Sequence, residues 1–153
     1  MAEKLNAGDI CNRIVTFAER RMSLVEAAKL MREHHVGSLV VVDESGAGRL
    51  VVGMLTDRDI VTAVVAKDVD VRALQVGDVM STDVVTAREG DSLLDTLAVM
   101  RRHGVRRVPV TDARGVLQGV LSLDDVTEVV GEQISALVQA LTSGRRQEER
   151  RRR

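Results

Sequence analysis

The chain contains an internal duplication, and this feature constrains its fold more than any other. Shifted by 69 residues, "MREHHVGSLVVVD" (residues 31–43) lies over "MRRHGVRRVPVTD" (residues 100–112) with six identities. Beyond these segments the first copy has a loop that is three residues longer, and the shift becomes 66. There "GMLTDRDI" (residues 53–60) lies over "GVLSLDDV" (residues 119–126). Two long matches in the same order indicate a tandem repeat.

Both copies have the same predicted order of elements, β-α-β-β-α. The sequence "SLVE" from Ser23 is a capping box that begins a helix, and "SLLD" from Ser92 is a close variant. A second helix is expected to begin at Thr56 in one copy and at Ser122 in the other. Short runs rich in β-branched residues predict the strands. The expected strands are residues 14–17, 38–42 and 50–55 of the first copy and 84–86, 107–110 and 116–121 of the second.

A single copy of about 60 residues buries little surface by itself. We therefore expect an α+β (α/β) fold in which the two copies pack together with pseudo-twofold symmetry. The core is almost wholly aliphatic, because hydrophobic residues make up 44% of the chain and Phe17 is its one aromatic residue. The expected boundaries are residues 8–66 for the first repeat, 67–75 for a linker, 76–131 for the second repeat and 132–153 for a C-terminal helix with an Arg-rich tail.

Composition also argues against several functional classes. Nucleic-acid binding through stacked bases is not expected, because the aromatic side chains it uses are missing. The lone Cys11 excludes an internal disulfide and a thiolate zinc site, and no metal site is predicted. No apolar segment near the N-terminus is long enough for a signal peptide or membrane span, so we expect a cytoplasmic protein without a membrane partner.

The most informative polar motif occurs twice, as Thr56-x-x-Asp59 and Ser122-x-x-Asp125. One interpretation is a helix capping box, in which the hydroxyl and the carboxylate accept from the first free N–H groups. The other is a ligand site, in which the carboxylate accepts two ribose hydroxyls and the helix start faces phosphate. The two interpretations are compatible.

The duplicated order resembles a tandem pair of CBS domains, also called a Bateman module. The residues that carry this resemblance are "SLVEAAKLMREHHVGSLVVVD", "GMLTDRDI", "DVMSTDVVT", "SLLDTLAVMRRHGVRRVPVTD" and "GVLSLDDV". The resemblance covers roughly residues 8–131. It implies a stand-alone regulatory module that binds an adenosyl ligand such as AMP, ADP, ATP or S-adenosylmethionine between its repeats, requires no cofactor, and forms a homodimer.

The resemblance also implies roles for individual residues. Asp59 and Asp125 would bind ribose, and Thr56 and Ser122 would face phosphate. Arg106 and Arg107 would bind phosphate, because a guanidinium group fits phosphate oxygens. The first repeat has Gly37 and Ser38 at these positions, and its basic candidate is Arg58. Candidates for the adenine slot are Val84, Val85, Thr86, Val105 and Pro109 in the second repeat and Val15, Thr16, Val36 and Leu39 in the first.

The two sites are therefore expected to differ. The site around Ser122 and Asp125, with Arg106 and Arg107, is expected to bind phosphate better than the site around Asp59. Spacing leaves open whether Thr16 or Phe17 corresponds to Thr86, since "TFAERRMS" has one residue more than "TAREGDS".

The sequence thus predicts a non-enzymatic adenine-nucleotide sensor that changes shape on binding and acts on an unknown protein target. Two alternatives stay open. One is a ligand-free dimeric interaction module. The other is a nucleic-acid-associated regulator that uses residues 144–153, which hold six arginines and two glutamates, whereas the rest of the chain has a net charge of about −5.

Overall fold

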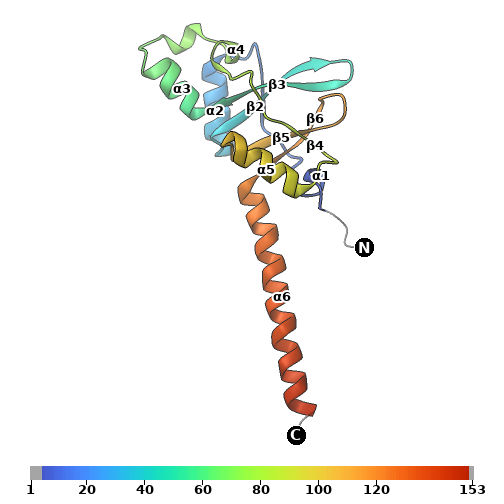
Figure 1. The fold of residues 1–153 in the computed structure, drawn as a ribbon. Helices are drawn as coiled ribbons and strands as arrows, with labels where there is room; N and C mark the ends of the chain where they lie inside the picture. The colour runs from blue at the N-terminus through green and yellow to red at the C-terminus, as the bar shows by residue number, and fades with distance from the viewer. Residues whose placement is uncertain (1–4, 152–153) are drawn as a thin grey trace.

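The computed structural model describes residues 5–151 and contains two three-stranded sheets, one for each repeat (Figure 1). The first repeat has the order β1-α2-β2-β3-α3, and the second has β4-α5-β5-β6-α6. Its elements are β1 (Phe17–Glu19), α2 (Leu24–His34), β2 (Ser38–Ser45), β3 (Gly48–Thr56) and α3 (Asp57–Ile60). Those of the second repeat are β4 (Ala87–Arg88), α5 (Leu93–His103), β5 (Arg107–Thr111), β6 (Leu117–Ser122) and α6 (Leu123–Arg151). The predicted β-α-β-β-α unit is confirmed in both copies.

Four shorter helical segments complete the chain. They are α1 (Ala7–Ile10), a π-helix η1 (Val61–Val65), a 3-10 helix η2 (Val71–Ala73) and α4 (Val76–Val79). α1 and α4 lie 69 residues apart, so they are equivalent segments of the duplication.

The first strand of each repeat begins later than predicted. β1 starts at Phe17 and β4 at Ala87, whereas the expected strands were residues 14–17 and 84–86. Ala18 pairs with Val41 in one sheet, and Ala87 pairs with Val110 in the other. Phe17 is therefore the structural equivalent of Thr86, which resolves the open alignment. The preceding segments are not in the sheets because they cross between the repeats.

These crossing segments exchange α1 and α4 between the two cores. The amides of Ala7 and Gly8 in α1 donate to carbonyls at Asp91 and Glu89 of the second repeat. In α4, Val76 donates to the Met22 carbonyl of the first repeat. Ala7 and Cys11 are buried in the second repeat's core, and Val76 is buried in the first repeat's core. Each repeat is thus completed by a segment that precedes the other repeat in sequence.

A pair of backbone hydrogen bonds holds each crossing segment beside the last strand of a repeat, β6 or β3. Asn12 and Val120 exchange two backbone hydrogen bonds of 2.9 Å, and Ser81 and Met54 exchange an equivalent pair of 2.8 and 2.9 Å. The adjacent strand residue is a glycine in both copies. A Cβ on Gly119 would lie 2.6 Å from the Cys11 sulfur and 2.8 Å from the Asn12 carbonyl oxygen. The glycine permits this close backbone approach.

We expect Gly119→Ala to lower the free energy of unfolding by about 1–3 kcal/mol, the usual cost of overpacking. The added methyl group meets a backbone carbonyl that this pair of hydrogen bonds holds in place. Gly46→Ala is the matched control, because a Cβ there meets nothing within 4 Å. Urea unfolding followed by circular dichroism measures both variants. Equal stability of the two variants would contradict the close approach.

The C-terminal helix is longer than predicted. Residues 132–153 were expected to form a separate helix, but α6 runs without a break from Leu123 to Arg151. Gly131 is the weakest helix former at the expected boundary, and a single helical glycine costs only about 1 kcal/mol. The neighbouring residues contain no proline that would end the helix. Most of the predicted tail is thus the end of α6, and Arg152 and Arg153 lie outside the described residues.

The turn between β5 and β6 is organised by Asp112. Its Oδ1 accepts hydrogen bonds from the backbone N–H groups of Arg114 at 2.8 Å and Val116 at 3.0 Å, and its Oδ2 accepts from the Arg114 guanidinium at 3.0 Å. The Val116 N–H, followed by the contacts of Arg114, lowers the pKa of Asp112 below its usual value.

We expect Asp112→Asn to destabilise the protein in a pH-dependent manner. Because the pKa of Asp112 is lower in the folded state, the ionised carboxylate contributes stability that is fully present above the unfolded-state pKa of about 3.9. This contribution is lost as pH falls through the lower folded-state pKa. Urea midpoints at pH 7, 5 and 3.5 should show an equal gap to wild type at the first two values and a smaller gap at the third. A gap that widens at acidic pH would contradict this sign.

Candidate functional site

Two clefts lie where the repeats meet, and each contains one copy of the duplicated Thr/Ser-x-x-Asp motif. The Thr56 cleft has a volume of about 730 Å³. It is lined by Gly37, Ser38, Met54, Thr56, Asp57, Arg58, Asp59, Ser81, Asp83, Val84, Val85, Val105, Arg106, Arg107 and Asp124. Since these residues come from both repeats, a ligand bound here would bridge them.

The Ser122 cleft is smaller, at about 230 Å³. It is lined by Asn12, Ile14, Val15, Thr16, Val36, Ser38, Val40, Met54, Arg107, Val120, Ser122 and Asp125. Its volume falls below the usual range of about 300–1,000 Å³ for small-molecule sites, whereas the Thr56 cleft falls within it.

Both copies of the Thr/Ser-x-x-Asp motif are helix caps in the structure. Asp59 Oδ2 accepts the Thr56 N–H at 2.9 Å, and Thr56 Oγ1 accepts the Asp59 N–H at 3.1 Å. In the other copy, Asp125 Oδ2 accepts the Ser122 N–H at 3.2 Å and the Ser122 hydroxyl at 2.6 Å. The capping interpretation is therefore confirmed. Among the described residues, these bonds use one carboxylate oxygen of each aspartate, and Oδ1 is left to accept from a ligand.

The arginines are distributed differently from the expected grouping. Arg107 lines both clefts, but Arg106 lines the Thr56 cleft and is not brought to Ser122 and Asp125. Arg106 forms an exposed ion pair of 3.4 Å with Asp124. Arg58 also lines the Thr56 cleft, and none of the ion pairs among the described side chains uses Arg58 or Arg107. Two guanidinium groups in this cleft are therefore available to bind an anion.

Each cleft also contains apolar side chains from the repeat that does not supply its aspartate. Val84, Val85 and Val105 of the second repeat lie in the Thr56 cleft, opposite Asp59 of the first. Val15, Thr16 and Val36 of the first repeat lie in the Ser122 cleft. In the described structure, Thr86, Pro109 and Leu39 line neither cleft. Pro109 and Leu39 are buried, and Thr86 is exposed beside β4.

Sequence reasoning missed several residues that line the clefts. Ile14 lies in the Ser122 cleft and is 91% exposed, although it was expected to be a strand residue. Its equivalent in the Thr56 cleft is Asp83, 69 residues later. Met54 lines both clefts from β3. Most of these residues line the clefts because residues 11–16 and 80–85 cross between the repeats. Aligning the two repeats does not reveal this crossing.

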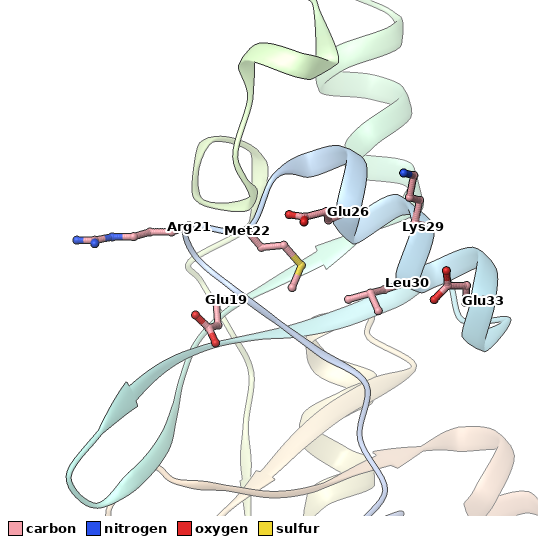
Figure 2. A pocket seen from close by; sticks show the side chains of 7 residues that line it. All are labelled: Glu19, Arg21, Met22, Glu26, Lys29, Leu30 and Glu33. Atoms are coloured by element: carbon pink, nitrogen blue, oxygen red, sulfur yellow. The ribbon is translucent and has the colours of Figure 1, made fainter.

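A separate hollow of about 510 Å³ lies on the outside of the first repeat, away from both motifs (Figure 2). Met22 and Leu30 point toward one another from either side of it, and Arg21 points away. Glu19, Glu26, Lys29 and Glu33 complete the lining. It contains neither copy of the duplicated Thr/Ser-x-x-Asp motif.

The described residues contain no cluster of three or more His, Cys, Asp or Glu side chains suited to a metal ion. Cys11 is buried, and burial raises the pKa of its thiol. A smaller fraction of the side chain is therefore in the reactive thiolate form. Within residues 5–151, no helix has both the length and the apolar character needed to span a bilayer.

Comparison with known proteins identifies the fold and its family. The family model for the CBS domain matches twice, at residues 7–66 and 76–132. An uncharacterized protein of Methanopyrus kandleri, MK0525, is 31% identical over 125 residues, which cover 82% of this chain and 62% of that protein. Hypoxic response protein 1 of Mycobacterium tuberculosis is 32% identical over 137 residues, which cover 90% of this chain and 94% of that protein.

Two solved structures show the same architecture. Hypoxic Response Protein I, crystallised with two coordinated zinc ions, has a TM-score of 0.70 and 34% identity, covering 80% of this chain and 97% of that chain. The CBS domain pair of protein MJ0100, in complex with 5′-methylthioadenosine and S-adenosyl-L-methionine, has a TM-score of 0.73 and 26% identity, covering 86% and 99%. With two matched repeats packed around two clefts, this chain belongs to the CBS domain family as a tandem CBS pair.

Proposed function

We propose that this CBS pair is a regulatory module that binds an adenine nucleotide in the Thr56 cleft and signals by a ligand-dependent change of shape. The observation that carries the proposal is the combination found in that cleft. It contains a carboxylate with a free oxygen, three valines and two arginines without ion-pair partners. These are the groups needed for ribose, adenine and phosphate respectively.

Phosphate binding is proposed for the Thr56 cleft, in place of the preference for Ser122 drawn from the sequence. Arg58 and Arg107 contribute two positive charges without an ion-pair partner among the described side chains, and Arg106 is held only by an exposed pair. A guanidinium fork matches the oxygens of a phosphate group. The Ser122 cleft has Arg107 alone, and it is less than half as large.

Ribose binding is proposed for Asp59. Its Oδ2 is occupied by the cap, so the bond that holds the helix start also fixes the direction of Oδ1. A carboxylate oxygen held in this way accepts a ribose hydroxyl without loss of side-chain freedom on binding.

The Ser122 cleft is proposed to take an adenosyl ligand with little negative charge, or to stay empty. Its exposed Ile14 replaces the charged Asp83 of the other cleft and offers an apolar face for a base. The MJ0100 pair was crystallised with two adenosyl compounds that carry no phosphate, 5′-methylthioadenosine and S-adenosyl-L-methionine. This precedent supports the adenosyl class as a whole.

Signalling follows from the two-repeat composition of the cleft. Asp59 belongs to the first repeat, whereas Val84, Val105 and Arg106 belong to the second. A ligand that contacts both sides favours the relative orientation of the repeats in which all contacts are made. It shifts the population of orientations by its difference in affinity between them. The proposed role is regulatory rather than catalytic.

A thermal-shift panel tests this proposal. The full chain is heated with AMP, ADP, ATP, S-adenosylmethionine, 5′-methylthioadenosine and NAD, with GTP and inorganic triphosphate as controls for base and phosphate. At 100 times the dissociation constant, a ligand stabilises the fold by about 2.7 kcal/mol. We expect ATP or ADP to give the largest rise in melting temperature. If no adenosyl compound raises it, the sensor function is excluded and an interaction module becomes the better account.

A further inference from the structure

Most of α6 extends beyond the two repeats (Figure 1). This part carries an exposed row of apolar side chains. Val130, Ile134, Leu137 and Leu141 follow at spacings of four, three and four residues, which is the a/d spacing of coiled coils. We call these four residues the α6 seam. Together with Val138 beside them, they are between 42% and 68% exposed. A helix face of this kind favours a helical partner.

The α6 seam continues a row that is already buried. Leu123 and Val126, seven and four residues before Val130, lie on the same side of the helix and pack against the second repeat's core. The following positions, Gly144 and Glu148, are not apolar. The exposed part therefore runs from Val130 to Leu141, about 16 Å at 1.5 Å per residue. It begins where the repeat's own packing ends.

Charge indicates what covers the α6 seam. The first turns of α6 carry Asp124, Asp125, Glu128 and Glu132, and its end carries Arg145, Arg146, Arg150 and Arg151 together with Glu148 and Glu149. At 100° per residue, Asp124 is the acidic residue nearest the seam side, whereas the other three of the first turns lie on the opposite face. None of the ion pairs among the described side chains uses an arginine of α6. Arg145 follows Leu141 by four residues, so it lies on the seam side of the helix.

A second copy of the same helix is complementary to this pattern in one orientation. A parallel pair would set Arg151, which falls on the same a/d spacing as the α6 seam, against Arg151 of the second copy. An antiparallel pair would set Arg145 near Asp124 of the other helix and would separate the Arg151 side chains of the two copies. Flanking charges of this kind decide partner orientation in paired helices.

We propose that the α6 seam binds the α6 seam of a second copy of this chain, with the two helices antiparallel. Val130 of one copy then faces Leu141 of the other, and Ile134 faces Leu137, so every layer is apolar. The two CBS pairs lie at opposite ends of the helix pair. Because the α6 seam lies beyond the repeats, this contact is separate from both clefts and from any dimer made by the repeats themselves.

Sedimentation velocity of the full chain and two variants tests the contact. Leu137→Glu places a carboxylate in the α6 seam, whereas Gln139→Glu places the same charge on the opposite face of the helix. We expect Leu137→Glu to raise the dissociation constant of self-association by more than about 10-fold, and Gln139→Glu to leave it unchanged. Residue 137 is exposed in the single chain, so an unchanged thermal melt of the repeats verifies folding. A monomeric wild type, or equal association of both variants, overturns the proposal.

Disulfide trapping tests the orientation. In a Cys11→Ala background, Val130→Cys and Leu141→Cys chains are oxidised separately and as a mixture. The antiparallel pair predicts a crosslinked dimer in the mixture and little in either chain alone. Crosslinking of each variant with itself would show a parallel pair, and absence of any crosslink would show that these positions do not meet. Either result overturns the proposed geometry.

Discussion

Replacing Arg58 and Arg107 together with glutamine is expected to weaken ATP binding by about 100-fold. A hydrogen bond to a charged group contributes about 1.5–3 kcal/mol, and each 1.4 kcal/mol is a factor of ten in affinity. The lower end applies here, because both side chains are exposed to solvent. Two such losses give the expected factor. Isothermal titration calorimetry at fixed salt measures it, since phosphate contacts weaken as ionic strength rises.

Adenosine provides the first control for this variant, because it has the base and ribose but no phosphate. Its affinity should change by less than about threefold. Arg32→Gln with Arg72→Gln is the matched protein control, since it removes the same charge from exposed positions outside both clefts. If the matched control weakens ATP binding as much as the cleft variant, net charge and not the Thr56 cleft explains the effect.

Asp59→Ala is expected to weaken every ligand that carries a ribose by about 1.5–3 kcal/mol, or roughly 10- to 150-fold. The variant removes the Oδ1 acceptor and also the helix cap, so stability falls by about 1 kcal/mol. Asp125→Ala is the matched control, because Asp125 accepts the Ser122 N–H as Asp59 accepts the Thr56 N–H. The two variants lose the same kind of cap but alter different clefts.

The comparison between these two variants separates the clefts. Asp59→Ala should weaken ATP binding by this factor, whereas Asp125→Ala should leave ATP binding unchanged and affect only a weaker adenosyl ligand. The opposite result would place the nucleotide in the Ser122 cleft, as the sequence first suggested. Equal, small effects in both variants would show that the aspartates act as helix caps alone.

The duplication made most of the fold predictable from sequence. Matched segments of the two copies predicted the β-α-β-β-α order, and the hydroxyl groups of Ser23 and Ser92 marked the starts of α2 and α5. The first strands were placed too early because β-branched residues at 14–16 and 84–86 are typical of strands. In the structure these residues lie outside the sheets, and all of them except Thr86 line a cleft, a tertiary effect that overrides local propensity.

The duplicated motifs of the site could be predicted from the sequence, but the residues that surround each motif could not. Asp59 and Asp125 could be selected from the repeat alone. Their neighbours could not, because residues before each first strand cross to the other repeat, as the backbone hydrogen-bond pairs at Asn12 and Ser81 show. This crossing brings Asp83 beside the Thr56 motif and Ile14 beside the Ser122 motif. Aligning the two repeats shows which residues are equivalent. It does not show which residues of one repeat contact residues of the other.

A crystal structure of the chain grown with ATP is the most direct test of the central claim. It should show the base against Val84 and Val105, a ribose hydroxyl on Asp59 Oδ1, and phosphate oxygens on Arg58 and Arg107. ATP bound in the Ser122 cleft, ATP in the hollow beside Met22 and Leu30 (Figure 2), or a nucleotide-free Thr56 cleft at saturating ATP would contradict it.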